Sequence, residues 1–89
     1  MISYTTKRFR SCFERLPPDV QQQAREAYKR WIENPLHPAL RFKCVHPTQP
    51  IFSVRVSRHY RAVGVREDDS MIWFWIGSHN EYDRLLGSL

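Results

Sequence analysis

An unbroken run of six large apolar residues, "MIWFWI", occupies positions 71–76. A strand with one wet face alternates apolar and polar side chains, so a run without alternation predicts a strand that is covered on both faces. We therefore expect residues 71–76 to form the central strand of a sheet. The run ends at Gly77-Ser78, and a dense polar cluster, "HNEYD", follows directly at residues 79–83.

Other segments predict the strands beside this one. From residue 51 the pattern has a period of two, typical of a strand with one buried face: Phe52, Val54 and Val56 alternate with Ser53, Arg55 and Ser57. The segment "YRAVGVR" at 60–66 predicts the returning strand, and an acidic turn at 67–70 leads into the apolar run. Residues 2–6 predict a short opening strand, and "ALRFKCV" at 39–45 predicts a brief edge strand.

Between the first two predicted strands the period changes to that of helices. One apolar stripe ends before Pro17-Pro18, and a second runs from Val20 to Trp31 and ends before Asn34-Pro35. Two helices joined by a Pro-Pro corner predict an αα-hairpin. Ser78 and Glu81 have the spacing of a capping box, which predicts a short C-terminal helix. The apolar positions of the three helices are Phe9, Cys12, Phe13 and Leu16; Val20, Ala24, Ala27, Tyr28 and Trp31; and Tyr82, Leu85 and Leu86.

The predicted order is β-α-α-β-β-β-α, in one domain spanning residues 1–89. This order predicts an α+β fold in which a small antiparallel sheet is backed on one face by the N-terminal αα-hairpin. The central strand is apolar on both sides, so we also expect something to cover the second face of the sheet.

The chain has 89 residues and a net charge of +5, with 14 Lys and Arg against nine Asp and Glu. Such a positive field favours a polyanion or an acidic protein as the partner. Cys12 lies on an apolar helix face, which indicates a buried free thiol and hence a reducing, cytoplasmic location. No leader or membrane span is apparent, and the four histidines show no metal-ligand spacing, so we expect no membrane, metal or cofactor.

The relation between Arg55 and Arg61 depends on the turn that joins their strands. A two-residue loop at Arg58-His59 pairs Arg55 with Ala62, whereas a three-residue loop at 57–59 places Arg55 directly opposite Arg61. The apolar parity of the two strands favours the second arrangement. Like charges across a sheet are destabilising, so this pairing indicates an anion between the arginines, unless both are solvated or paired with the acidic turn.

The polar cluster after the central strand offers groups that handle protons. His79 and Tyr82 are three apart at a helix start and project from one side of it. Imidazole exchanges protons near neutral pH, and a phenol hydrogen-bonds or stacks on a base. Glu81 is explained by capping alone. Arg41 and Lys43 alternate with apolar residues, which places both cations on one side of the chain if that segment is extended.

Taken together, the segment 16–43, the "SVRVSRHYRAV" hairpin and the terminal "IGSHNEYDRLL" are similar to the RelE/ParE superfamily of bacterial type II toxin–antitoxin toxins. The resemblance covers nearly the whole chain. It implies a RelE-like endoribonuclease that cleaves mRNA on the ribosome and is held inactive by an antitoxin. In that family the ribose 2′-hydroxyl attacks the adjacent phosphate without a metal, which the resemblance implies here too, and the cleavage leaves a 2′,3′-cyclic phosphate and a free 5′-hydroxyl.

The resemblance also implies roles for individual residues. Arg61 matches the arginine that contacts the scissile phosphate, Arg55 a cationic position on the preceding strand, and His79 and Tyr82 the C-terminal acid/base and stacking positions. The lysine-rich members carry two lysines where this chain has Ser53 and Arg55. Arginine is a poor base, so either His79 takes the base role, as in the histidine-bearing branches, or the activity is weak. We expect three further cations, Arg41, Lys43 and Arg58, to bind RNA.

Two alternative functions stay open for a protein with this fold. Some members of the superfamily inhibit DNA gyrase and cut no RNA, and a degenerate member would retain only antitoxin binding. In every case we expect an antitoxin partner that is acidic and partly hydrophobic, laid across the sheet and the C-terminal helix. Its carboxylates should meet Arg55, Arg61 or neighbouring cations, and its apolar anchors should pack beside an exposed Trp73 or Trp75.

Overall fold

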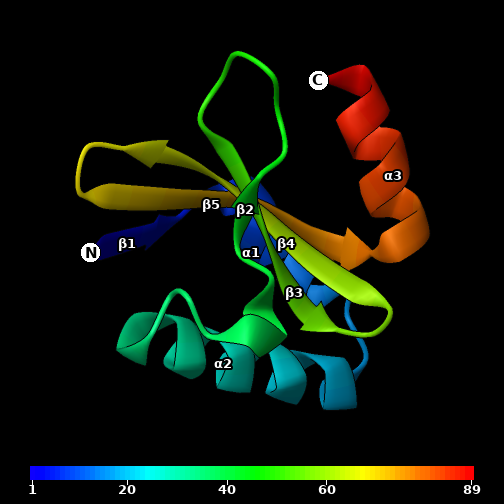
Figure 1. Cartoon of the computed structure of the whole chain (residues 1–89). Coiled ribbons are helices and arrows are strands. Elements are labelled where there is room, and N and C mark those ends of the chain that lie inside the picture. The colour runs from blue at the N-terminus through cyan, green and yellow to red at the C-terminus, as the bar shows by residue number, and fades with distance from the viewer.

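The computed structural model describes residues 1–89 as a five-stranded sheet with three α-helices (Figure 1). The strand order is β1-β5-β4-β3-β2, so the apolar run lies in β5, an interior strand. The predicted element order and the α+β class are confirmed. The elements are β1 (Ile2–Thr5), α1 (Lys7–Glu14), α2 (Pro18–Glu33), the 3₁₀ helix η1 (Pro38–Leu40), β2 (Lys43–Cys44), β3 (Ile51–Ser57), β4 (Tyr60–Glu67), β5 (Ser70–Ser78) and α3 (His79–Ser88).

The sheet is mixed, which corrects the expectation of a wholly antiparallel sheet at one strand. β2, β3, β4 and β5 pair antiparallel, but β1 pairs parallel with β5 and joins Ile2 to Ser70 in the register. A hydrogen bond from Thr6 N–H to the Trp73 carbonyl, at 3.0 Å, continues this ladder. Parallel strands need a long connection, and the chain between β1 and β5 contains every other strand and two helices.

The two N-terminal helices back one face of the sheet, and each lies mainly on its own strand: α1 on β5 and α2 on β3. Trp31, which is 1% exposed, anchors α2. Its ring meets Trp73 edge-on with the ring centroids 5.3 Å apart, and Phe42 at 5.8 Å. Cys12 of α1 is buried and unpaired, as predicted. None of the helices combines the length with the apolar character that a membrane crossing requires.

The second face of β5 is covered by the protein's own C-terminal helix. Figure 1 shows α2 on one side of the sheet and α3 on the other. The register between β4 and β5 shifts at Phe74, where Val63 pairs with Trp75 but Gly64 pairs with Trp73. This bulge turns the two tryptophans to opposite faces, because Trp73 contacts Trp31 of α2 while Trp75 packs on Tyr82 of α3, centroids 6.4 Å apart.

The bulge requires a glycine on the facing strand. A Cβ atom on Gly64 would lie 2.6 Å from Cε of Met71 and 2.8 Å from the carbonyl oxygen of Ile72. No larger residue fits there without moving the backbone of β5. Both tryptophans are enclosed, with Trp73 4% and Trp75 7% exposed. The expectation that one of them is exposed as an anchor for a partner is therefore wrong.

Candidate functional site

Arg55 and Arg61 stand directly opposite each other on β3 and β4. The turn itself contains only Arg58 and His59, but the register shifts between Arg55 and Ser57, so that Val56 forms a bulge. The predicted pairing of Arg55 with Arg61 thus occurs, but through a two-residue turn and not through the three-residue loop that the prediction assumed. The bulge has the same effect as a longer loop, because it restores the parity that keeps Val54 paired with Ala62 on the helix-covered face.

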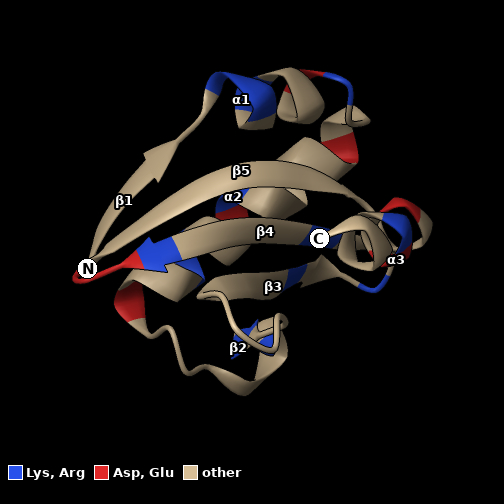
Figure 2. Cartoon of the chain, turned by 90° about the horizontal axis from the view of Figure 1, so that it is seen from above, with Lys and Arg blue, Asp and Glu red and all other residues tan.

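A polar cleft of about 150 Å³ opens on the other face, beside the start of α3. Figure 2 looks onto this face, with α2 behind the sheet. Four cations but no carboxylate line the cleft, so its field is strongly positive. We call this group of seven side chains the basic cleft: Arg41, Lys43, Ser53, Arg55, Arg61, His79 and Tyr82.

The basic cleft brings together all but one of the candidate residues. Arg58 does not line it; this residue is exposed in the β3–β4 turn, and its carbonyl accepts a long hydrogen bond of 3.4 Å from Arg61. Ser53 is the additional member. In the sequence its alternation with apolar neighbours placed it on the other face of β3, and the resemblance placed it where the lysine-rich members have a lysine.

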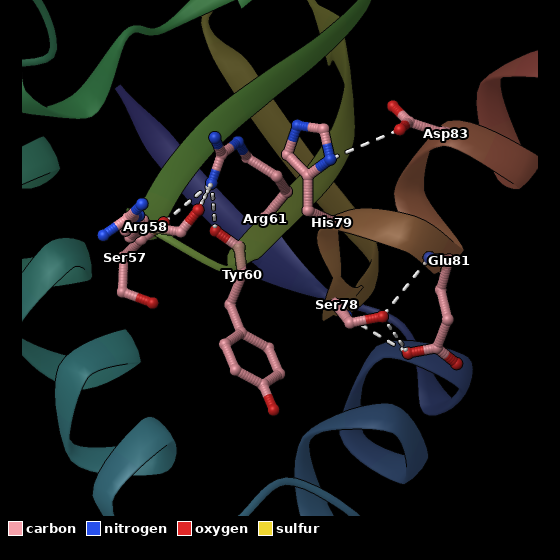
Figure 3. Close-up of polar contacts among 8 residues, drawn as sticks. All are labelled: Ser57, Arg58, Tyr60, Arg61, Ser78, His79, Glu81 and Asp83. Carbon is pink, nitrogen blue, oxygen red and sulfur yellow. Dashed lines mark hydrogen bonds and ion pairs between the residues drawn. The ribbon is translucent and has the colours of Figure 1, made fainter.

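Arg61 is fixed by backbone carbonyls at the end of its own hairpin. Its Nη1 donates to the carbonyl oxygens of Ser57 at 2.7 Å and Tyr60 at 2.9 Å (Figure 3). Burial, and next the charge of Arg55, lower the pKa of the Arg61 guanidinium. The guanidinium is still a cation, because arginine stays protonated in proteins. An anion between Arg55 and Arg61 would relieve the unfavourable environment that this shift reflects.

The cations of the basic cleft form no ion pair with a carboxylate. The only ion pair within 4.0 Å in the chain joins His79 to Asp83. The acidic turn at 67–70 lies at the opposite end of β4 from Arg61 and does not neutralise the arginines. The alternative in which that turn pairs with Arg55 and Arg61 is therefore excluded.

Arg41 and Lys43 reach the cleft by a turn and not by strand alternation. Arg41 has φ 46° and ψ 42°, a left-handed conformation, at the end of η1. Only Lys43 and Cys44 form β2, on the edge of β3. The expectation that Arg41 and Lys43 lie in one extended segment is therefore wrong, because Arg41 lies in a left-handed turn and only Lys43 is in the strand. Left-handed backbone at a residue with a side chain costs about 1 kcal/mol, and packing of Phe42 on Phe52, centroids 5.0 Å apart, helps to hold the segment.

The start of α3 is fixed at three points. Ser78 Oγ accepts from the Glu81 N–H at 3.2 Å, and Glu81 Oε1 accepts from the Ser78 N–H at 3.1 Å, so the predicted capping box is present. The Ser78 hydroxyl also donates to Glu81 Oε1 at 2.9 Å, and the two hydrogen bonds that the Ser78 N–H and hydroxyl donate lower the pKa of the Glu81 carboxyl. The His79 N–H donates to the His59 carbonyl at 2.7 Å, which ties the helix to the β3–β4 turn. The His79 ring is consequently held at the rim of the basic cleft.

Tyr82 forms the floor of the cleft. The side chain is 7% exposed, and its hydroxyl donates to Oγ of Ser53 at 3.0 Å, in a buried hydrogen bond between α3 and β3. Its ring packs on Trp75 and lies edge-on to His79, centroids 5.8 Å apart. This geometry indicates that Tyr82 positions α3 and His79, and that its hydroxyl faces Ser53.

The sequence model of the ParE-like toxin domain matches residues 18–84. The RelB–RelE antitoxin–toxin complex from Methanococcus jannaschii superposes with a TM-score of 0.73 at 14% identity, over 91% of this chain and 96% of that one. YafQ from E. coli gives 0.73 at 9% identity, over 90% and 94%. The RelBE2 complex from Mycobacterium tuberculosis gives 0.70 at 20% identity, over 88% and 90%. A comparison with curated protein sequences finds no significant match.

Proposed function

The chain belongs to the ParE-like toxin domain family and has the fold of RelE/ParE toxins, and from that premise we propose that it is an endoribonuclease that cleaves mRNA. The observation that supports this proposal most strongly is the convergence of four cations and one imidazole on a single cleft whose lining contains no carboxylate. A phosphodiester is the anion that such a cleft fits, and arginine forks match phosphate oxygens well.

The reaction that we propose is internal transesterification of the RNA backbone. The ribose 2′-hydroxyl loses its proton to His79 as its oxygen bonds to phosphorus, and the bond from phosphorus to the 5′-oxygen breaks. The products are a 2′,3′-cyclic phosphate and a 5′-hydroxyl that takes its proton from water. Arg55 and Arg61 stabilise the additional negative charge on the phosphorus oxygens. Positioned charge of this kind contributes roughly 10²–10³ in rate for each group, and a general base about 10²–10⁴.

The cations outside the arginine pair extend the site along the RNA. Arg41 and Lys43 lie on the cleft wall formed by the segment before β3, and we propose that they bind the neighbouring phosphate. Arg58 is exposed next to the cleft in the β3–β4 turn, from which it can reach a more distant part of the strand. A chain of 89 residues offers little surface for gripping RNA alone, which favours cleavage on the ribosome.

Primer-extension mapping of an mRNA translated in vitro tests the proposal. We expect discrete cuts with the wild-type protein, and at least a roughly 100-fold loss of cleavage in His79→Ala and in Arg61→Ala. Arg30→Ala, which removes an exposed cation from α2, is the matched control and should cleave normally. Undiminished cleavage by both cleft variants would show that the basic cleft is not the active site.

Inhibition of DNA gyrase is the second candidate, because the matching family model is that of ParE-like toxins. A gyrase inhibitor would block supercoiling, leave mRNA intact and be insensitive to His79→Ala. A supercoiling assay run beside the translation assay separates the two activities. If neither activity appears and induction without antitoxin leaves growth normal, the chain is an inert antitoxin-binding member.

An antitoxin partner is supported by two of the structural neighbours, which are toxins in complex with RelB antitoxins. We propose that an acidic segment of the antitoxin lies over the basic cleft and α3, with carboxylates that meet Arg55 and Arg61. Charge should then steer the encounter, so the association rate should fall as salt rises. A rate independent of salt, and a complex indifferent to charge reversal at both arginines, would place the antitoxin elsewhere.

A further inference from the structure

The histidines of this chain differ in the hydrogen-bond partner of the ring nitrogen Nδ1. In two of them Nδ1 faces a backbone N–H donor, and in His79 it faces a carboxylate acceptor. In two loops the Nδ1 atom accepts hydrogen bonds from backbone N–H groups: His37 from Ala39 at 3.1 Å, and His46 from Gln49 at 3.0 Å and Thr48 at 3.2 Å. A nitrogen that accepts a hydrogen bond has no proton of its own, so the neutral rings of His37 and His46 are protonated on Nε2.

His79 has the opposite arrangement. Its Nδ1 lies 3.3 Å from Oδ2 of Asp83, one helical turn further along α3 (Figure 3). An ionised carboxylate can only accept, so Nδ1 of His79 must be protonated to make this contact. In the neutral ring Nε2 is then bare, with its lone pair free to take a proton. Nε2 is on the opposite edge of the ring, away from Asp83 and toward the side on which Arg61 lies in Figure 3.

We propose that Asp83 is a positioning residue for His79: it holds the imidazole in the Nδ1–H tautomer and so presents Nε2 as the proton acceptor of the basic cleft. The inference rests on the proposed nuclease function for its consequence, but the tautomer itself does not depend on that function. Asp83 does not line the basic cleft itself; its direct contact is with His79, which does, and its charge also acts on Arg61 at longer range.

Three other contacts restrict the His79 ring and make this selection effective. The capping box fixes the first turn of α3, and the bond from the His79 N–H to the His59 carbonyl fixes the backbone at the ring. The Tyr82 ring lies edge-on to the imidazole and limits its rotation. The side chains of His79 and Asp83 are 45% and 62% exposed, so their ion pair adds little to stability. Its effect falls on the tautomer, and a carboxylate that sets the tautomer of a catalytic histidine can control the rate strongly.

Long-range ¹H–¹⁵N NMR of the labelled protein, at a pH where the rings are neutral, tests the inference without RNA. We expect His79 to show a protonated Nδ1 and a bare Nε2, while His37 and His46 show the reverse pattern in the same spectrum. In Asp83→Ala the His79 pattern should shift toward Nε2–H, and in Asp83→Glu it should return. The two loop histidines should be unchanged throughout, which also shows that the variants are folded.

Cleavage assays provide the second measurement. We expect kcat to fall roughly tenfold in Asp83→Ala with little change in KM, and to recover largely in Asp83→Glu. Asp69→Ala removes the same charge from the exposed β4–β5 turn, at the other end of β4, and should retain the wild-type rate.

The two measurements separate the two possible failures. An Nε2–H tautomer in the wild-type protein, or a tautomer that does not change in Asp83→Ala, would overturn the role of Asp83 even if RNA is cleaved. An Nδ1–H tautomer that depends on Asp83, in a protein that cleaves no RNA, would support the positioning role and reject the nuclease function.

Discussion

The two faces of the sheet are formed by the same strands but differ in the polarity and the charge of the side chains that line them. Between the sheet and the N-terminal helices lies an apolar groove of about 350 Å³, in which 12 of 15 lining residues are hydrophobic. On the other face, one of the seven residues that line the basic cleft is hydrophobic. Val54 and Ala62 line the groove, while the adjacent Arg55 and Arg61 line the cleft. Core and candidate site are therefore separated by one residue along each strand.

The site therefore depends on the register with which β3, β4 and β5 pair. Successive side chains of a strand point to opposite faces, so a slip of one residue would move the arginines into the core and the valines into water. The bulge at Val56 and the bulge at Phe74 both maintain this register, each at one edge of β4. Each face also has one unfavourable feature. The indole N–H of Trp31 is buried without a partner, and Arg55 faces a like charge.

The largest effect on stability is expected on the helix-covered face. Trp31→Ala should lower the free energy of unfolding by about 3–5 kcal/mol, because this side chain packs on Trp73, Phe42 and Tyr28. A small domain has about 5–15 kcal/mol in total. Urea denaturation measures the loss. Lys29→Ala, on the exposed side of α2, should change stability by less than about 0.5 kcal/mol. Equal losses in both variants would mean that Trp31 does not anchor the helix.

A smaller effect, of opposite sign, is expected on the cleft face. Arg55→Met removes the like charge opposite Arg61 and should raise the free energy of unfolding by roughly 0.2–1 kcal/mol, while RNA cleavage slows. Arg58→Met removes the same charge from the exposed turn and should leave stability nearly unchanged. Denaturation curves at low salt measure the difference. A loss of stability in Arg55→Met would show that the pair is not under electrostatic strain.

The smallest effect concerns the helix that closes the cleft face, and it depends on pH. The pKa of Glu81 is lower in the folded chain, so its ionised form stabilises the fold. That contribution is present above the ordinary carboxyl pKa of about 4.3 and is lost as the pH falls through the lowered value. We expect Glu81→Gln to be less stable than wild type at pH 7 by under about 1 kcal/mol, with the gap closing near pH 3. A gap of equal size at both pH values would contradict the capping role. In Ser78→Ala the free energy of unfolding should likewise be lower than that of wild type at pH 7, and this difference should also shrink near pH 3.

Much of this arrangement was predicted from the sequence, because it follows from local patterns. The two helices and the Pro17-Pro18 corner between them follow from spacing and from the fixed backbone of proline. The capping box of Ser78 and Glu81 follows from the offset of the two residues alone. The pairing of Arg55 with Arg61 was predicted from apolar parity, although through the wrong loop length.

What the sequence did not predict involves atoms far apart in the chain. The Tyr82 hydroxyl meets Ser53 across 29 positions, and neither residue carries a signal of the other. The left-handed turn at Arg41 was missed because left-handed backbone is uncommon at arginine. Trp73 or Trp75 was expected to be exposed, because the contacts of Trp31 with Trp73 and of Tyr82 with Trp75 have no sequence pattern.

The sequence by itself therefore determined the elements, their order, and which side chains share a face wherever a strand has no bulge, since periods of 2 and 3.6 are properties of the backbone alone. Only the tertiary structure decided that β1 pairs parallel with β5, that a bulge at Phe74 sends Trp73 and Trp75 to opposite layers, and that α3 covers the second one. The physical reason is that pairing partners, bulges and layer contacts depend on how side chains from distant segments fill a shared volume, and close packing in three dimensions leaves no period in the chain.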